Sequence, residues 1–190
     1  MNEEHDRTRS AVVEARHVHT ADLSEDDLRG LRAFLHDAYE GAFGDADWEH
    51  TLGGLHVLVH EGGQLVGHVA VVQRRLLHRD LALRTGYVEG LAVRPERRRR
   101  GYAGMAMAAA ERVIAAAYDL GALSDGTGIE EFYERRGWAR WRGPTFVLAP
   151  DGPRRTEDED GGILVLPTPT SPGLDLNGDL VCDWRPGDVW

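Results

Sequence analysis

The 190-residue chain contains little cysteine and no long apolar run, and both shortages narrow the class of protein. Its single cysteine, Cys182, excludes an internal disulfide framework and is compatible with a reducing compartment. No apolar run approaches the roughly 20 residues that a transmembrane helix requires. The first residues are polar and lack the apolar segment of a secretory signal peptide. We therefore expect a cytoplasmic protein without a membrane partner.

An excess of basic charge is also missing. The formal net charge is −10, whereas nucleic-acid binding requires a basic footprint over one face, so we expect no nucleic-acid partner. The negative charge is unevenly placed: residues 1–150 hold 23 acids and 19 bases, and residues 151–190 hold 9 acids and 3 bases. A polycationic partner would be attracted to the last segment. Charge alone, however, favours a simple contribution to solubility.

The stretch over residues 87–107, YVEGLAVRPERRRRGYAGMAM, is the most informative part of the chain. It begins as a short apolar strand, which Pro95 ends because proline lacks the N–H that a sheet needs. Four arginines and Gly101 follow, and then an Ala/Met-rich run predicts a helix to Tyr118. Backbone N–H groups at such a helix start bind anions. The alternative is a solvated basic turn or a nucleic-acid patch, but the net charge favours a phosphate-binding loop.

The other segments alternate between strand and helix signals, as expected of a mixed α/β protein in one domain with an extension. Ser24 offers a helix cap, and leucines at helical spacing follow it. The expected elements are a strand at 11–17, a helix at 25–40, a loop at 41–47, strands at 55–60 and 64–72, a strand pair or irregular hairpin at 74–83, a strand or turn at 121–124, a helix at 129–137, extended segments over 138–148, strands at 162–166 and 180–184, and irregular chain at 167–179.

Three histidines lie close together on the predicted strands. His56 and His60 are four residues apart, and His68 is on the next strand. A metal site can be imagined from them, but no acid or cysteine completes a ligand set at that spacing. We therefore expect structural or surface histidines and no metal.

Two local motifs resemble the GNAT superfamily of acyl-CoA-dependent N-acyltransferases. Arg98-x-x-Gly101-x-Ala103 is similar to its pyrophosphate loop, with the strand before it and the helix after it both present. Phe132-Tyr133-x-x-x-Gly137-Trp138 resembles the helix that follows the splayed strand. The resemblance implies the GNAT fold, a mixed and splayed central sheet with helices on both faces.

Longer stretches resemble one GNAT family, the actinobacterial aminoglycoside 2′-N-acetyltransferases. They are 47–54 (DWEHTLGG), 86–90 (GYVEG) and 182–190 (CDWRPGDVW). The resemblance implies acetyl-CoA as donor, the 2′-amine of an aminoglycoside as acceptor, antibiotic resistance and a homodimer. It also implies an acetyltransferase core at 1–150, with the acidic extension 151–190 packed on the same domain and contributing to the acceptor site. The acidic tail then has a partner, because charge-assisted hydrogen bonds orient an oligocation.

The same resemblance assigns the site residues. Glu89 and Tyr133 are the expected catalytic pair. Coenzyme A is expected to bind at Leu91, Ala92, Val93, Arg98, Arg99, Arg100, Gly101, Tyr102, Ala103 and Gly104. The acceptor is expected to bind at Asp47, Glu89, Gly90, Ser124, Asp158, Glu159, Asp188 and Trp190. Two departures affect this set: TEDEDG at 156–161 replaces a run of aspartates, which leaves the choice between Glu159 and its neighbours open, and Ala42 stands where some relatives have an acid.

In this interpretation Glu89 is the base that takes the amine proton, through a water or with a pKa raised by burial. Tyr133 is the acid that protonates the coenzyme A sulfur. The alternative is that Tyr133 is only an aromatic residue of the core. Direct transfer is expected, because Cys182 is remote in sequence from the motifs. Two other functions stay open: acetylation of another amino sugar or cell-wall metabolite, and a non-catalytic acetyl-CoA sensor. The sensor is disfavoured because it would need neither Glu89 nor Tyr133.

Overall fold

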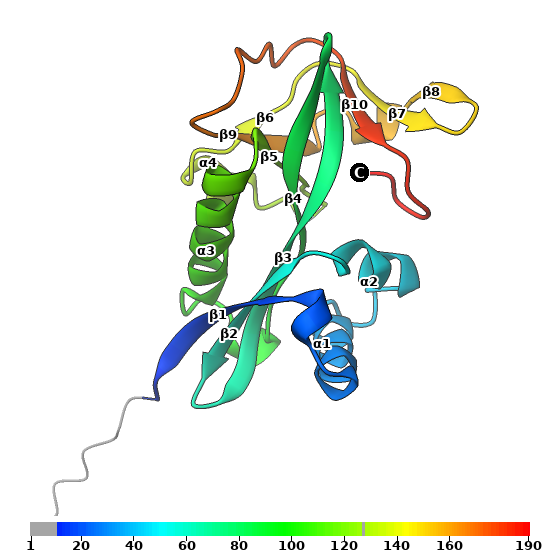
Figure 1. Ribbon diagram of the computed structural model, residues 1–190. Coiled ribbons are helices and arrows are strands. Elements are labelled where there is room, and N and C mark those ends of the chain that lie inside the picture. Colours follow the sequence, from blue (N-terminus) through cyan, green and yellow to red (C-terminus); the bar gives the residue numbers. More distant parts are fainter. Residues whose placement is uncertain (1–10, 127) are drawn as a thin grey trace, which may run out of the picture.

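The computed structural model describes residues 11–126 and 128–190. Its centre is an antiparallel hairpin of two long strands, β3 (Gln64–His78) and β4 (Leu81–Val93), which crosses the molecule (Figure 1). We expected a separate strand pair or an irregular hairpin over 74–83. Instead, residues 73–78 pair with residues 81–86 in unbroken register, so both strands simply continue to a tight turn. The turn is tight because Arg79 adopts a left-handed φ of 54°.

The hairpin is the middle of a 10-stranded mixed sheet. The order is β6-β9-β5-β4-β3-β10-β7-β8, and β2 pairs with both β3 and β1. The β4–β5 and β7–β10 pairs are parallel and the others are antiparallel. The remaining strands are β1 (Val13–His19), β2 (Leu55–Glu61), β5 (Leu120–Ser124), β6 (Ala139–Arg140), β7 (Thr145–Ala149), β8 (Gly152–Arg155), β9 (Ile163–Pro167) and β10 (Leu180–Asp183). Strand β8 was not expected from the sequence.

Strands β4 and β5 separate partway along their length. They pair through Tyr87 and Ala122 and share no further pair among the described residues. Just beyond Tyr87, β4 carries one residue more than β3 in the register, and Gly90 adopts a left-handed φ of 57°. A glycine tolerates this conformation because it lacks a Cβ, and such a bulge bends the strand. The opening between the two strands is therefore encoded at Gly90.

Helices cover both faces of the sheet, as expected. Helix α3 (Tyr102–Ala117) packs in one apolar cluster with Val57 and Val59, whereas α1 (Glu25–Ala38) packs in another with Leu58. Successive residues of β2 point to opposite faces, so the two helices lie on opposite sides (Figure 1). The other helices are α2 (Asp45–Thr51), α4 (Glu130–Glu134) and the 3-10 turns η1 (Thr20–Asp22), η2 (Pro95–Arg97) and η3 (Glu157–Glu159).

Helix α2 corrects the loop that we expected up to residue 47. The Gly44 N–H donates to Asp47 Oδ2 at 2.8 Å, which closes the first turn of the helix. Trp48 is buried in the α1 cluster and holds the helix on the core. A short acid-rich segment thus folds as a helix because one aromatic side chain anchors it. Asp47 is presented from a helix and not from a loop.

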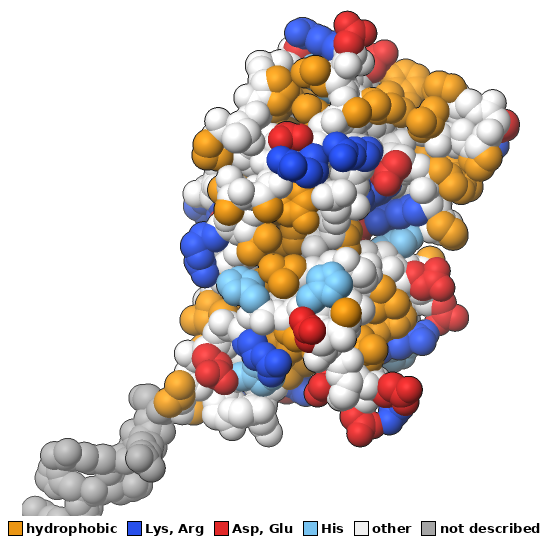
Figure 2. All heavy atoms as spheres, viewed as in Figure 1, with side chains coloured by type: hydrophobic (Ala, Val, Ile, Leu, Met, Phe, Trp, Pro, Cys, Tyr) orange, Lys and Arg blue, Asp and Glu red, His pale blue; other side chains and the backbone are white. Residues whose placement is uncertain are grey.

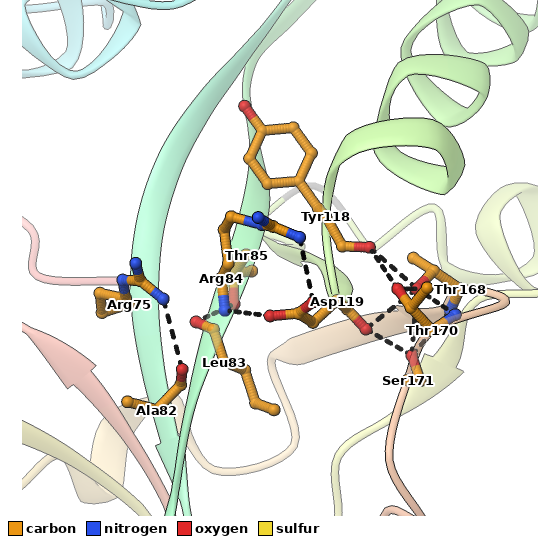
Figure 3. A network of polar contacts seen from close by, with 10 residues as sticks. All are labelled: Arg75, Ala82, Leu83, Arg84, Thr85, Tyr118, Asp119, Thr168, Thr170 and Ser171. Carbon is orange, nitrogen blue, oxygen red and sulfur yellow. Dashed lines mark hydrogen bonds and ion pairs between the residues drawn. The ribbon is translucent and has the colours of Figure 1, made fainter.

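The last 40 residues form part of the sheet. Strand β9 lies between β5 and β6, and β10 lies between β3 and β7. The connection between them is irregular, and Figure 3 shows how it is anchored. Thr168 Oγ1 donates to the Tyr118 carbonyl at 2.9 Å, and the Asp119 carboxylate accepts from the Arg84 N–H at 2.9 Å. The chain end lies between β10 and α2 (Figure 1), where the Trp190 ring is buried.

On the face shown in Figure 2, acidic and basic side chains are interspersed, and the coloured residues form no broad basic surface there. Within 11–126 and 128–190, no helix combines the length and the apolar character needed to span a membrane.

Candidate active site

Glu89 and Gly90 lie where β4 leaves β5. The bulge places the Glu89 side chain in a cavity while leaving it 15% exposed. Behind the bulge, His68 Nδ1 donates to the Gly90 carbonyl at 2.7 Å, and His56 Nδ1 lies 2.9 Å from His68 Nε2. Burial lowers the pKa of His68 to about 3 and that of His56 to about 4. Both imidazoles are therefore neutral and support the bulge from the core.

The cavity beside Glu89 has a volume of about 340 Å³ and is lined by segments that are far apart in sequence. Strands β4 and β5, helices α2 and α4, and the chain end all contribute to its wall. Of the residues expected to bind the acceptor or to act on it, the structure brings these together: Asp47, Glu89, Gly90, Ser124, Tyr133, Asp188 and Trp190. Ala42, where some relatives carry an acid, also lines it.

Two residues expected at the acceptor site do not line this cavity. Asp158 is exposed on the 3-10 turn η3. Glu159 is half-buried and lies one contact away, because Ser124 Oγ donates to its Oε2 at 3.4 Å. Burial raises the pKa of Glu159, and Asp188 adds to the effect. Glu159 therefore borders the cavity through Ser124, whereas Asp158 lies farther out.

The cavity is strongly acidic. Carboxylates from four side chains line it: Asp47, Glu89, Asp125 and Asp188. Basic groups on the wall are Arg185 and His50. Burial raises the pKa of Glu89, and the guanidinium groups of Arg185 and Arg74 oppose that rise. A cavity of this charge suits a cationic, hydroxyl-rich ligand.

The tyrosines Tyr133 and Tyr39 also line the cavity. Tyr133 is buried on α4 against the rings of Phe132 and Trp138. Burial raises its pKa well above the ordinary value, so the phenol keeps its proton at neutral pH. Tyr39, at the end of α1, donates its hydroxyl to the Leu91 carbonyl at 3.0 Å. Burial, with Glu89 and Asp47 nearby, raises the pKa of Tyr39 to about 12.

A second cavity, of about 710 Å³, lies beside the start of α3. It is lined by most residues expected to bind coenzyme A: Leu91, Ala92, Val93, Arg98, Arg99, Gly101, Tyr102, Ala103 and Gly104. Arg100 is exposed and does not line it. Gly101 caps α3 with a left-handed φ of 88°, and no atom lies within 4 Å of where its Cβ would be. The helix start is therefore open for an anion to approach.

The two cavities meet. Tyr39, Leu91 and Ile129 line both of them. A thioester that reached along β4 from the second cavity would come close to Glu89. Among the residues that the structure describes, no group of three or more His, Cys, Asp or Glu side chains is arranged to hold a metal ion.

Several cavity residues were absent from the sequence interpretation. Tyr39, His50, Tyr87, Asp125 and Arg185 line the acidic cavity. His50, Tyr87 and Arg185 stand within the stretches 47–54, 86–90 and 182–190 that carried the resemblance, and this position was the available signal for them. Tyr39 and Asp125 stand outside those stretches, and the folded chain brings them to the cavity.

Comparison with known proteins agrees with this geometry. Residues 20–138 match the acetyltransferase (GNAT) family. The chain is 51% identical over 178 residues to an aminoglycoside 2′-N-acetyltransferase of Mycolicibacterium fortuitum, covering 93% of this chain and 91% of that protein.

Solved structures share the fold at low sequence identity. A GNAT family N-acetyltransferase from Escherichia coli, in complex with CoA, aligns with a TM-score of 0.59 and 16% identity over 93% of this chain and 90% of that chain. A GNAT family acetyltransferase from Brucella melitensis, in complex with acetyl-CoA, aligns with a TM-score of 0.58 and 16% identity over 90% of this chain and 95% of that chain. From the splayed sheet, the open helix start, the matched family and the close relative, we conclude that the chain belongs to the GNAT acetyltransferase family.

Proposed function

We propose that the chain transfers the acetyl group of acetyl-CoA to the 2′-amine of an aminoglycoside, by direct transfer between two bound substrates. The observation that carries this proposal is the junction of an acidic cavity with an open helix-start cavity at Leu91. The acidic cavity suits an oligocation. The relative from Mycolicibacterium fortuitum supplies the regiochemistry, since its name is that of a 2′-N-acetyltransferase.

Acetyl-CoA binds along β4 and at the start of α3 in this proposal. Backbone groups of residues 91–93 pair with the pantetheine arm, and N–H groups of residues 101–104 receive the pyrophosphate. The first turn of α3 contains no acid that would repel a phosphate. Arg99 and Arg100 are exposed beside this turn and add positive charge. Arg98 is partly engaged, because its Nη2 donates to the Ala38 carbonyl at 2.8 Å.

The acceptor binds in the acidic cavity through charge-assisted hydrogen bonds to Asp47 and Asp188, with Trp190 on the wall beside it. Glu159 contributes from the border through Ser124. The segment 151–190 then belongs to the acceptor site as well as to the fold, beside a core at 1–150. An ammonium–carboxylate hydrogen bond contributes about 1.5–3 kcal/mol, so several of them hold a highly hydrated ligand.

The reaction requires two proton movements. The 2′-amine nitrogen attacks the thioester carbon, its proton passes to Glu89 directly or through a water, and the carbon–sulfur bond breaks. Tyr133 then donates its proton to the departing thiolate, which gives coenzyme A and the N-acetyl product. Burial suits both groups, because it makes Glu89 a stronger base and keeps Tyr133 protonated. A covalent acyl-enzyme is not needed, since Cys182 is buried and burial raises its pKa to about 11.

Four broader parts of the proposal rest on the sequence: the resemblance supports the dimer and the resistance, and the composition supports the location and the absence of membrane and nucleic-acid partners. The chain acts as a homodimer, works in the cytoplasm, binds neither membrane nor nucleic acid, and gives resistance to the antibiotics that it acetylates. Light scattering on the purified chain tests the dimer: a monomer mass at micromolar concentration would contradict it.

The deciding experiment is turnover of acetyl-CoA with two aminoglycosides that differ only in having an amine or a hydroxyl at the 2′ position. We expect turnover with the 2′-amine and almost none with the 2′-hydroxyl. Equal rates would contradict acetylation at the 2′ position, although the chain would still be an acetyltransferase. Turnover of a simpler amino sugar in preference to both would favour a metabolic acceptor.

A further inference from the structure

Arg185 joins the expected base to backbone oxygens of the segment 188–190. Its Nη1 forms an ion pair with Glu89 Oε1, and its Nη2 donates to the backbone oxygen of Trp190 at 2.5 Å. Its Nε donates to the Asp188 carbonyl at 2.8 Å. One planar guanidinium therefore contacts the expected base and two residues of the segment that follows β10.

We propose that Arg185 is a positioning residue of the acceptor site, which holds the Glu89 carboxylate in a fixed place against the segment 188–190. The proposal deepens the proposed function and rests on it. A guanidinium can hold the carboxylate and two backbone oxygens at once because its donors form a rigid planar fork, which the single ammonium of a lysine cannot reproduce.

The surroundings keep Arg185 from swinging away. Its side chain is only 13% exposed and lies over the buried Tyr87 ring, 5.5 Å from the ring centre. On one side of the segment, the Pro186 carbonyl lies 2.8 Å from His50 Nε2. On the other side, the buried Trp190 donates from its indole to Thr156 Oγ1 at 2.9 Å. The arginine is therefore held in place before any substrate arrives.

The contact also divides the two oxygens of the Glu89 carboxylate. Arg185 takes Oε1, and no described residue forms a hydrogen bond to Oε2. Oε2 is thus the atom left for the amine proton or for a bridging water. The charged or titratable groups around Glu89 come from β3, β4, α2, the end of α1, the turn after β5 and the segment 185–190. They are Arg74, Tyr87, Asp47, His50, Tyr39, Asp125, Arg185 and Asp188.

This arrangement fixes the sign of a pH effect. Burial raises the pKa of Glu89, and Arg185 is the leading group that lowers it again. Removing the guanidinium leaves burial unopposed on that side, so the carboxylate takes up a proton at higher pH. A protonated Glu89 cannot accept the amine proton, and the acid limb of kcat/KM must therefore move to higher pH.

The test compares Arg185→Gln and Arg185→Lys with the control Arg154→Gln, which removes an exposed arginine from β8. In Arg185→Gln we expect the acid limb to rise by about 1–2 pH units, with coenzyme A affinity unchanged. Arg185→Lys should restore the limb in part but not kcat, since the fork is lost. The control should match the wild-type profile.

A second readout does not depend on turnover. Carbon-13 labelling of glutamate carboxyls, with Glu89→Gln to assign the signal, follows the titration of Glu89 directly by NMR. A Glu89 signal that titrates at the same pH with and without Arg185 would overturn the inference. Absence of turnover in the wild type, with the Glu89 titration still shifted, would instead contradict the proposed function alone. If Arg185→Gln does not fold, wild-type kcat/KM in Arg185→Lys would overturn the inference.

Discussion

At the scale of residues, the site depends on groups whose protonation is set by burial. Tyr133 is buried between aromatic rings and keeps its proton, whereas Glu89 is held by Arg185 and has a pKa raised by burial. An acid with a high pKa and a base with a raised pKa form a matched pair for two proton transfers. Each can be tested by a single substitution.

Tyr133→Phe removes the proposed proton donor and retains the packed ring. We expect kcat to fall by roughly 10²–10⁴-fold, the range for a positioned acid. Coenzyme A affinity, measured by calorimetry, should stay near the wild-type value. Tyr118→Phe is the matched control, because Tyr118 lies beyond the far end of α3 from the helix-start cavity and lines neither cavity. Wild-type kcat in Tyr133→Phe would return Tyr133 to a packing role.

The His56–His68 pair predicts an acid-sensitive fold. Both pKa values, about 4 and about 3, lie below the unfolded value of about 6.5. Between these limits the unfolded chain binds more protons, so the free energy of unfolding should fall as the pH drops. The fall is at most about 1.4 kcal/mol per pH unit for each histidine.

Urea unfolding at about pH 7.5 and about pH 5 checks this prediction. His68→Asn should lower stability at the higher pH and reduce the difference between the two conditions. His17→Gln, at an exposed position on β1, should leave the wild-type difference intact. An equal pH dependence in both variants would show that the buried pair does not titrate on unfolding.

At the scale of elements, the unit β4–turn–α3 could be predicted because its signals are local. Pro95 ends the strand region, and Gly101 opens a helix with a left-handed φ. The bulge at Gly90 could not be recognised as a bulge, since it depends on the register with β3 and on His68 behind it. Helix α2 was missed because Trp48 stabilises it through tertiary packing, which outweighs a weak local propensity.

The site was predictable to the extent that its residues stand in contiguous motifs. Glu89 and Gly90 line the acidic cavity, and the residues of the 98–104 loop except Arg100 line the second cavity. Tyr39 and Arg185 reach the same place from positions 50 and 96 residues from Glu89, and long-range packing alone brings them there. In the acidic turn at 156–161, being contiguous did not show which acid lies near the cavity. Asp160 pairs with Arg155, and Asp158 faces solvent.

Gly101→Val tests the helix-start element. No neighbour obstructs a Cβ at this position, so the effect must come from the left-handed backbone and from blocked anion approach. The backbone cost of about 1–2 kcal/mol predicts roughly tenfold weaker coenzyme A binding. Gly173→Val, in open space on the irregular segment, is the control. If Gly101→Val binds coenzyme A as tightly as the wild type does, the loop at 98–104 is not part of the coenzyme A site.

The terminal segment is tested by its charge. Deleting 187–190 would also remove the buried Trp190 ring, so Asp188→Asn is the cleaner change, since its Oδ1 can still accept from the Trp190 N–H. Losing one carboxylate should weaken acceptor binding about tenfold, and raised salt should weaken the wild type in the same direction. Asp151→Asn, in an exposed turn, controls for net charge. If Asp188→Asn binds the acceptor as tightly as the wild type does, Asp188 contributes to solubility and not to acceptor binding.

At the scale of the whole molecule, the last 40 residues do two things at once. Strands β9 and β10 complete the sheet, and the chain end closes the acidic cavity over Glu89. The negative charge of this segment therefore lies partly where a polycation would bind. The donor cavity meets this site at Leu91, so both substrates can be bound together.

The most direct test of the account is the position of the acetyl group in the product. An aminoglycoside that carries several free amines is converted with acetyl-CoA, and the product is mapped by two-dimensional NMR. We predict a single acetyl group, on the 2′-nitrogen, with one coenzyme A released for each acceptor consumed. Acetylation at another nitrogen, or at a mixture of positions, would contradict the claim that the cavity around Glu89 orients the 2′-amine toward the thioester.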